Sequence, residues 1–83
     1  MADAADTSLD LRGLKCPLPA LRTRKALAGL AAGRLLEVSC TDPMAAIDIP
    51  HLVASDGHLL ESSEQRDGVL TFRIRKGEVR KNA

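Results

Sequence analysis

The chain has 83 residues, of which 45% are hydrophobic, and its formal net charge is +1. A chain of this length forms one domain that removes only about 60–65% of its unfolded surface from water, which excludes a roomy substrate cavity. The near-neutral charge argues against strong nonspecific binding to nucleic acid, and no apolar run is long enough to span a bilayer.

The two ends of the sequence lack hydrophobic periodicity. We predict flexible tails at residues 1–7 and 78–83 around a single domain at 8–77. The opening MADAADTS carries acids where a signal peptide carries basic residues, so we expect a cytoplasmic protein. In that reducing compartment, the two cysteines are expected to be free thiols.

The first half of the domain predicts a strand followed by a helix. Residues 8–12, SLDLR, alternate between apolar and polar and end before Gly13. Residues 17–32 have apolar positions on one broad side, with Pro17 suited to the first helical position and Gly33 to the stop. We therefore expect an amphipathic helix directly after the first turn.

A second strand and a second helix follow. Residues 34–40, RLLEVSC, alternate again, and Asp42 with Pro43 is typical of a helix start. The helix is expected through residues 44–55, but Pro50 removes one of its hydrogen bonds. The helix is therefore either kinked there or restarts with Asp48 as a new cap.

The last part of the domain predicts a β-hairpin. Strand patterns at residues 58–65 and 68–76 flank Asp67-Gly68, a strong signal for a tight turn. The element order is β-α-β-α-β-β, and each strand has one mostly polar face. We predict an α/β (α+β) two-layer sandwich in which both helices cover one face of a four-stranded mixed sheet.

Cys16 is the candidate reactive residue. The first β-α-β unit is expected to be parallel and right-handed, which places Cys16 at the carboxyl edge of the sheet, where functional groups gather. Six basic residues and no acidic one lie between Leu11 and Leu36: Arg12, Lys15, Arg22, Arg24, Lys25 and Arg34. Cys16 is predicted to occupy the helix N-cap, where the helix dipole and Lys15 lower the pKa of a thiol.

The motif around Cys16 suggests how the sulfur is used. Pro17 and Pro19 have no N–H, so Leu18 is the expected donor in the first turn, and the stiff backbone after Gly13 presents the sulfur outward. Pro19 also stands where a dithiol oxidoreductase has its resolving cysteine. The site suits a persulfide that waits for another protein's thiolate. The alternative is that Cys16 is an ordinary small residue at a helix start with no chemical role. The residues alone do not decide between these two interpretations.

Residues 8–77 resemble the TusA/SirA family of sulfur carriers, whose marker is Cys-Pro-x-Pro at the start of the first helix. The resemblance rests on Asp10, Gly13, Cys16, Pro17, Pro19, Arg24-Lys25, Asp42-Pro43, Asp48-Ile49-Pro50 and Ile74-Arg75-Lys76-Gly77. It implies a βαβαββ sandwich similar to the C-terminal domain of bacterial translation initiation factor three.

The same resemblance implies the function. Cys16 would accept sulfane sulfur as a persulfide from a cysteine desulfurase or rhodanese-type donor and pass it to a partner protein. Family members serve transfer RNA thiolation, molybdenum cofactor formation or oxidative sulfur metabolism, and the motif does not select among these. We expect a monomeric sulfurtransferase without cofactor or metal. The alternatives are a noncatalytic regulatory module on the same fold and a thiol redox protein.

The basic residues near the first helix and the second cysteine each have a functional and a purely structural interpretation. Arg24 lies within the apolar arc of the first helix and either docks a partner or covers the edge of the core, whereas Lys15, Arg22 and Lys25 are predicted docking charges. Cys40 departs from the family pattern and is either a buried structural thiol or an internal sulfur acceptor.

Two further binding functions are disfavoured by the sequence. His51 and His58 are expected at the surface, and with the two cysteines they give no close ligand pair of zinc-site spacing. Phe72, the single aromatic residue, is expected in the core, so no aromatic side chain is left to stack on bases and direct, tight nucleic-acid binding is not expected.

Overall fold

The structure is a computed structural model that describes residues 5–77. Its elements follow the predicted order: β1 (Thr7–Leu11), α1 (Leu18–Ala28), β2 (Leu35–Cys40), α2 (Ala45–Ser55), β3 (Leu59–Arg66) and β4 (Val69–Arg75). The four strands form one sheet in the order β1-β2-β4-β3. β1 pairs with β2 in parallel and the other two pairings are antiparallel, so the predicted mixed sheet is confirmed.

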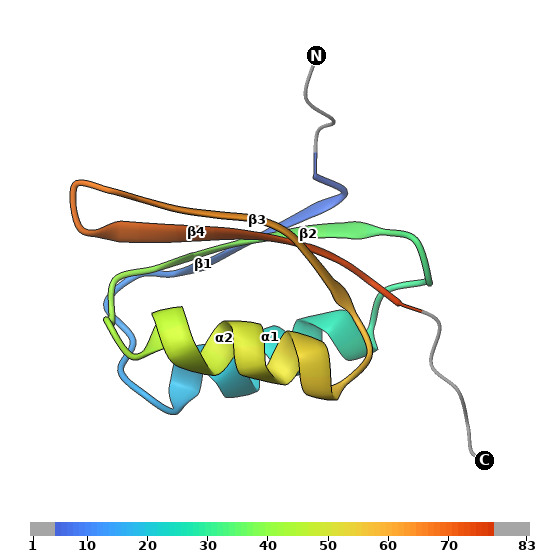
Figure 1. Ribbon diagram of the computed structural model, residues 1–83, viewed down its shortest axis with the longest axis horizontal. Coiled ribbons are helices and arrows are strands. Elements are labelled where there is room, and N and C mark those ends of the chain that lie inside the picture. The colour runs from blue at the N-terminus through green and yellow to red at the C-terminus, as the bar shows by residue number, and fades with distance from the viewer. Residues whose placement is uncertain (1–4, 78–83) are drawn as a thin grey trace.

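Both helices lie side by side against one face of the sheet, as Figure 1 shows. The core between the two layers is aliphatic apart from Phe72 and Cys40. The sheet contributes alternate residues of its two central strands, Leu36, Val38 and Cys40 from β2 and Leu70, Phe72 and Ile74 from β4. This alternation confirms the predicted two-layer sandwich, because it gives each central strand one face for the helices.

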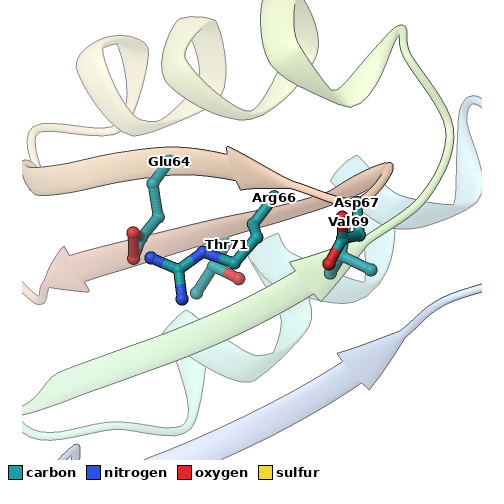
Figure 2. Close-up of a pocket in the computed structure, with 5 residues that line it drawn as sticks. All are labelled: Glu64, Arg66, Asp67, Val69 and Thr71. Carbon is teal, nitrogen blue, oxygen red and sulfur yellow. The ribbon is translucent and has the colours of Figure 1, made fainter.

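The other face of the sheet is polar. Arg73 on β4 pairs with Glu37 on β2 at 2.7 Å, and Arg75 pairs with Glu61 on β3 at 2.8 Å. Near the hairpin, a shallow depression of about 330 Å³ is lined by Glu64, Arg66, Asp67, Val69 and Thr71 (Figure 2). Its lining holds neither a cysteine nor a histidine, so this depression offers no nucleophile of that kind.

The β3–β4 hairpin is confirmed in detail. Asp67 and Gly68 both have positive φ angles, 53° and 79°, and Arg66 pairs directly with Val69. Positive φ at both central residues is the geometry of a two-residue hairpin turn whose twist matches that of the strands.

The first helix is shorter than predicted. It ends at Ala28 with Gly29 as its C-cap, whereas the sequence pattern extended it to residue 32 with Gly33 as the stop. Gly33 instead has a φ of 88° in the following loop, and its N–H donates to the carbonyl of Lys76 at 2.9 Å. The loop bonds to the end of β4, which explains why the chain leaves the helix early.

The second helix is also placed differently at its start. It begins at Ala45 with Met44 as N-cap, two residues after the predicted cap at Asp42. The carboxylate of Asp42 still accepts a hydrogen bond from the Met44 N–H at 3.1 Å. The helix runs without a break through Pro50, which excludes the predicted restart at Asp48. Leu52 and Val53 beyond the proline are buried, so core packing holds the helix together where one hydrogen bond is missing.

The ends of the domain differ slightly from the prediction. Thr7 and Asp6 fall within the predicted tail, yet Thr7 opens β1 and the carboxylate of Asp6 accepts a hydrogen bond from the N–H of Leu35 at 2.8 Å. The predicted tail at residues 78–83 lies outside the described residues. Within residues 5–77, neither helix is both long and apolar enough to cross a membrane.

We predict that Gly77→Ala destabilises the fold by about 1–3 kcal/mol. A Cβ at Gly77 would clash with the carbonyl oxygen of Gly57, a backbone atom that cannot move aside easily. Gly29→Ala is the matched control, because its Cβ would meet only ordinary van der Waals contact at 3.7 Å. Urea denaturation of both variants checks this; equal midpoints would contradict the predicted close approach.

Candidate functional site

Cys16 lies in the exposed loop between β1 and α1. Gly13 begins this loop with a φ of 87°, and its N–H donates to Thr41 Oγ1 at 2.8 Å. The N-cap of α1 is Pro17 and not Cys16, so the predicted capping position of the sulfur is wrong by one residue. The N–H of Leu18 donates to the carbonyl of Lys15 at 2.8 Å and thus turns toward the loop backbone.

Asp42 fixes the backbone of Cys16 from the neighbouring loop. One of its carboxylate oxygens accepts a hydrogen bond from the Cys16 N–H, and the other accepts from the Met44 N–H at 3.1 Å. The two loops that follow the parallel strands β1 and β2 are therefore joined through one half-buried carboxylate. Both backbone bonds lower the pKa of Asp42, and the charge of Lys15 lowers it further.

Asp48 contacts the sulfur itself. It lies in the first turn of α2, and the Sγ of Cys16 donates a hydrogen bond to its Oδ2 at 3.2 Å. Sequence analysis treated Asp48 as a helix cap and missed this contact. The available signal was its place at the start of the second helix, which the parallel β-α-β unit brings to the same edge as the first.

These carboxylates reverse the predicted electrostatics of the thiol. The pKa of Cys16 is raised, first by the hydrogen bond to Asp48, then by partial desolvation and by the negative charges of Asp48 and Asp42. The predicted lowering by the helix N-terminus and Lys15 is therefore wrong. A direct bond to a carboxylate favours the protonated thiol, and the first-turn N–H of Leu18 is used by Lys15.

The remaining motif residues shape the loop. Pro19 is buried and anchors the start of α1 in the core, while Pro17 and Leu18 are exposed beside Cys16. Further exposed apolar side chains come from the same parts of the two helices or just before them: Leu21, Met44 and Ile47. The starts of both helices therefore carry exposed apolar side chains.

The four predicted docking residues fall into two groups. Lys15, Arg22 and Lys25 are exposed. Arg24 is also exposed, but its guanidinium pairs with Asp56 just after α2, at 2.8 Å and 3.3 Å. Arg24 thus links the two helices on the surface through its guanidinium.

Cys40 is fully buried at the end of β2, where burial and the charge of Asp42 raise its pKa to about 11. Its expected position on the core face is confirmed. His51 is exposed, as expected, whereas the half-buried His58 accepts a hydrogen bond at Nδ1 from the Gly77 N–H at 3.0 Å. Within the part of the chain that the structure describes, no group of three His, Cys, Asp or Glu residues is placed to hold a metal ion.

Comparison with known proteins identifies the family to which this site belongs. Residues 7–76 match the family model described as sulfurtransferase TusA. The chain belongs to the TusA family. The resemblance seen in the sequence is thereby confirmed, and the family's sulfur-carrier role applies to this chain.

Individual relatives and a solved structure also support membership of the TusA family. The chain is 45% identical to a putative sulfur carrier protein, YrkI, of Bacillus subtilis over 88% of this chain and 97% of that one. It is 40% identical to the sulfur carrier protein TusA of Allochromatium vinosum over 92% and 99% of the two chains. A SirA-like protein of Desulfitobacterium hafniense superposes with a TM-score of 0.76 at 30% identity, covering 87% of this chain and 99% of that one.

We predict that Asp48→Asn lowers the pKa of the Cys16 thiol. An amide cannot supply the negative charge that favours the protonated sulfur, so more thiolate is present at neutral pH. The rate of alkylation by iodoacetamide, measured against pH in a Cys40→Ala background, is expected to rise severalfold at pH 7 with its midpoint shifted down. A midpoint that stays in place would contradict the role given to Asp48.

Proposed function

We propose that this TusA-family protein carries sulfur as a persulfide on Cys16. The thiol would accept sulfane sulfur from a donor protein and hand it to an acceptor protein. Two features support the proposal. The sulfur is exposed in a loop that hydrogen bonds of Gly13 and Asp42 hold in place. Pro19 stands at the position where a resolving cysteine would be expected. A persulfide formed there has no second thiol in the motif to displace it.

The observation that carries this proposal is the contrast between the two cysteines. Cys16 is exposed and Cys40 has none of its surface exposed. The pKa of Cys40, raised to about 11, also keeps it in the unreactive thiol form. A large partner protein can therefore reach one sulfur in this chain, as relay by protein contact requires.

Docking would use the surface around the thiol. Lys15, Arg22 and Lys25 would attract an acidic partner, and the apolar side chains of Leu21 and Ile47, 53% and 63% exposed, would lose water on contact. Arg24 would contribute through a surface already ordered by its pair with Asp56. Specificity would then lie in protein contacts, because no deep cavity surrounds the sulfur among the described pockets.

The donor and acceptor stay predictions. A cysteine desulfurase or a rhodanese-type enzyme would supply the sulfur. The acceptor would belong to transfer RNA thiolation, molybdenum cofactor formation or oxidative sulfur metabolism. A cytoplasmic monomer without cofactor, and without direct, tight binding to nucleic acid, is the form in which we expect the protein to act.

We predict that Cys16→Ser abolishes sulfur loading while Cys40→Ala retains it. Each protein is incubated with a cysteine desulfurase and cysteine and then weighed intact without reductant. The natural chain and Cys40→Ala are expected to gain the mass of one or more sulfur atoms, because the exposed thiol is the acceptor. A natural chain that gains nothing would point to a regulatory module, and one that loses two hydrogens would point to a redox protein.

We also predict that Lys25→Ala combined with Arg22→Ala slows loading by the desulfurase at low salt more than at high salt. Exposed charges act mainly on the association rate, and salt screens them. The matched control is Arg66→Ala on the hairpin, whose side chain lies at the depression of Figure 2 on the polar face of the sheet. Equal effects at both salt concentrations would exclude an electrostatic role for the two helix residues.

A further inference from the structure

Asp48 is placed to exchange a proton with the reacting sulfur. Its Oδ2 lies 3.2 Å from Cys16 Sγ, and its carboxylate is half-buried in the first turn of α2. Asp42 accepts the backbone N–H of Cys16, and Asp48 belongs to the first turn of α2, so ordered backbone holds both the sulfur and the carboxylate. The other charged groups that act on this pair are Asp42 itself and, through Asp42, Lys15.

The resting thiol has to lose its proton before it can accept sulfur. The thiolate is the nucleophile in exchange reactions at sulfur, and here the sulfur donates its hydrogen to a carboxylate. A group within hydrogen-bond reach of the proton that is abstracted is the geometric requirement for general base catalysis. Within residues 5–77, Asp48 is the side chain that accepts this hydrogen bond.

We propose that Asp48 is a catalytic residue that takes the proton of Cys16 as Sγ attacks the sulfane sulfur of the donor and passes it to the sulfur that departs. The proposal rests on the function proposed above and adds a second residue to it. The carboxylate makes no capping hydrogen bond in α2, so besides its favourable place in the first turn of the helix its contact is with the sulfur.

The atoms and electrons of this step balance without an oxidant or a reductant. During loading, a bond forms between Sγ and the outer sulfur of the donor persulfide, and the donor's S–S bond breaks. Its electron pair stays on the donor's inner sulfur, which receives the proton from Cys16 through Asp48, while the outer sulfur keeps its own hydrogen. During delivery, the acceptor's thiol loses its proton and Sγ, now the departing sulfur, regains one through the same carboxylate.

Two reactions of the same thiol separate a catalytic carboxylate from one that merely suppresses ionisation. Alkylation by iodoacetamide releases iodide, which needs no proton, so its rate follows the thiolate fraction and the nucleophilicity of the thiolate and gains nothing from an acid. Sulfur uptake from glutathione persulfide releases a thiolate that has to be protonated. Both rates are measured at pH 7 on the full chain in a Cys40→Ala background, alkylation by loss of free thiol and uptake by intact mass.

For Asp48→Asn, we expect alkylation to become faster and sulfur uptake to become at least about tenfold slower, since positioned acid–base groups contribute on the order of 10²- to 10⁴-fold and the larger thiolate fraction offsets part of the loss. Asp48→Glu keeps a carboxylate and is expected to restore part of the uptake. Glu64→Gln removes one negative charge from the lining of the hairpin depression and is expected to change neither rate (Figure 2). Circular dichroism verifies that each variant is folded.

Opposite changes in the two rates, with partial recovery in Asp48→Glu, support the catalytic role. Uptake that rises in parallel with alkylation, or that does not change, overturns it and leaves Asp48 as a suppressor of the thiolate. A natural chain that is alkylated yet takes up no sulfur overturns the proposed function itself. The failure of the two proposals is therefore distinguishable.

Discussion

The site depends on the attachment of one exposed loop to the start of the second helix. Asp42 accepts the backbone N–H of Cys16, and Asp48 accepts the hydrogen of its sulfur. Both carboxylates come after β2, and the loop comes after β1, so the parallel pairing of these two strands brings them together. Without that pairing, Cys16 would lie on a loop with no fixed neighbours, and its sulfur would have no acceptor.

This attachment sets the chemical state of the thiol. The start of a helix favours an anion through its dipole and its unpaired N–H groups. At Cys16, a carboxylate in direct contact and a second one close by oppose that effect, and the pKa of the thiol rises. The contact with Asp48 therefore favours the protonated form of the sulfur over the thiolate.

The rest of the domain forms the core that holds the Cys16 loop and the start of α2 in place. The central strands β2 and β4 fill the core with alternate apolar side chains, and both helices cover that face (Figure 1). Cys16 itself is exposed in its loop, which agrees with the proposed recognition across a surface. Cys40 fits this arrangement as a core residue, since its burial keeps a second thiol out of reach of a partner.

The sequence by itself determined the order of the elements, the hairpin at Asp67-Gly68 and the place of Cys16 just before the first helix, because alternation, turn residues and the Cys-Pro-x-Pro motif are local signals. Only the tertiary structure decided the electrostatics of the thiol, since Asp48 lies 32 residues away and reaches the sulfur through strand pairing. It also decided where α1 ends, because the loop with Gly33 bonds to Lys76 at the end of β4. Contacts between segments distant in the chain leave no periodic trace in the sequence. Residue patterns therefore put Cys16 at the correct edge of the sheet, but they misplaced the helix cap by one residue and misjudged the direction in which the pKa of the thiol is shifted.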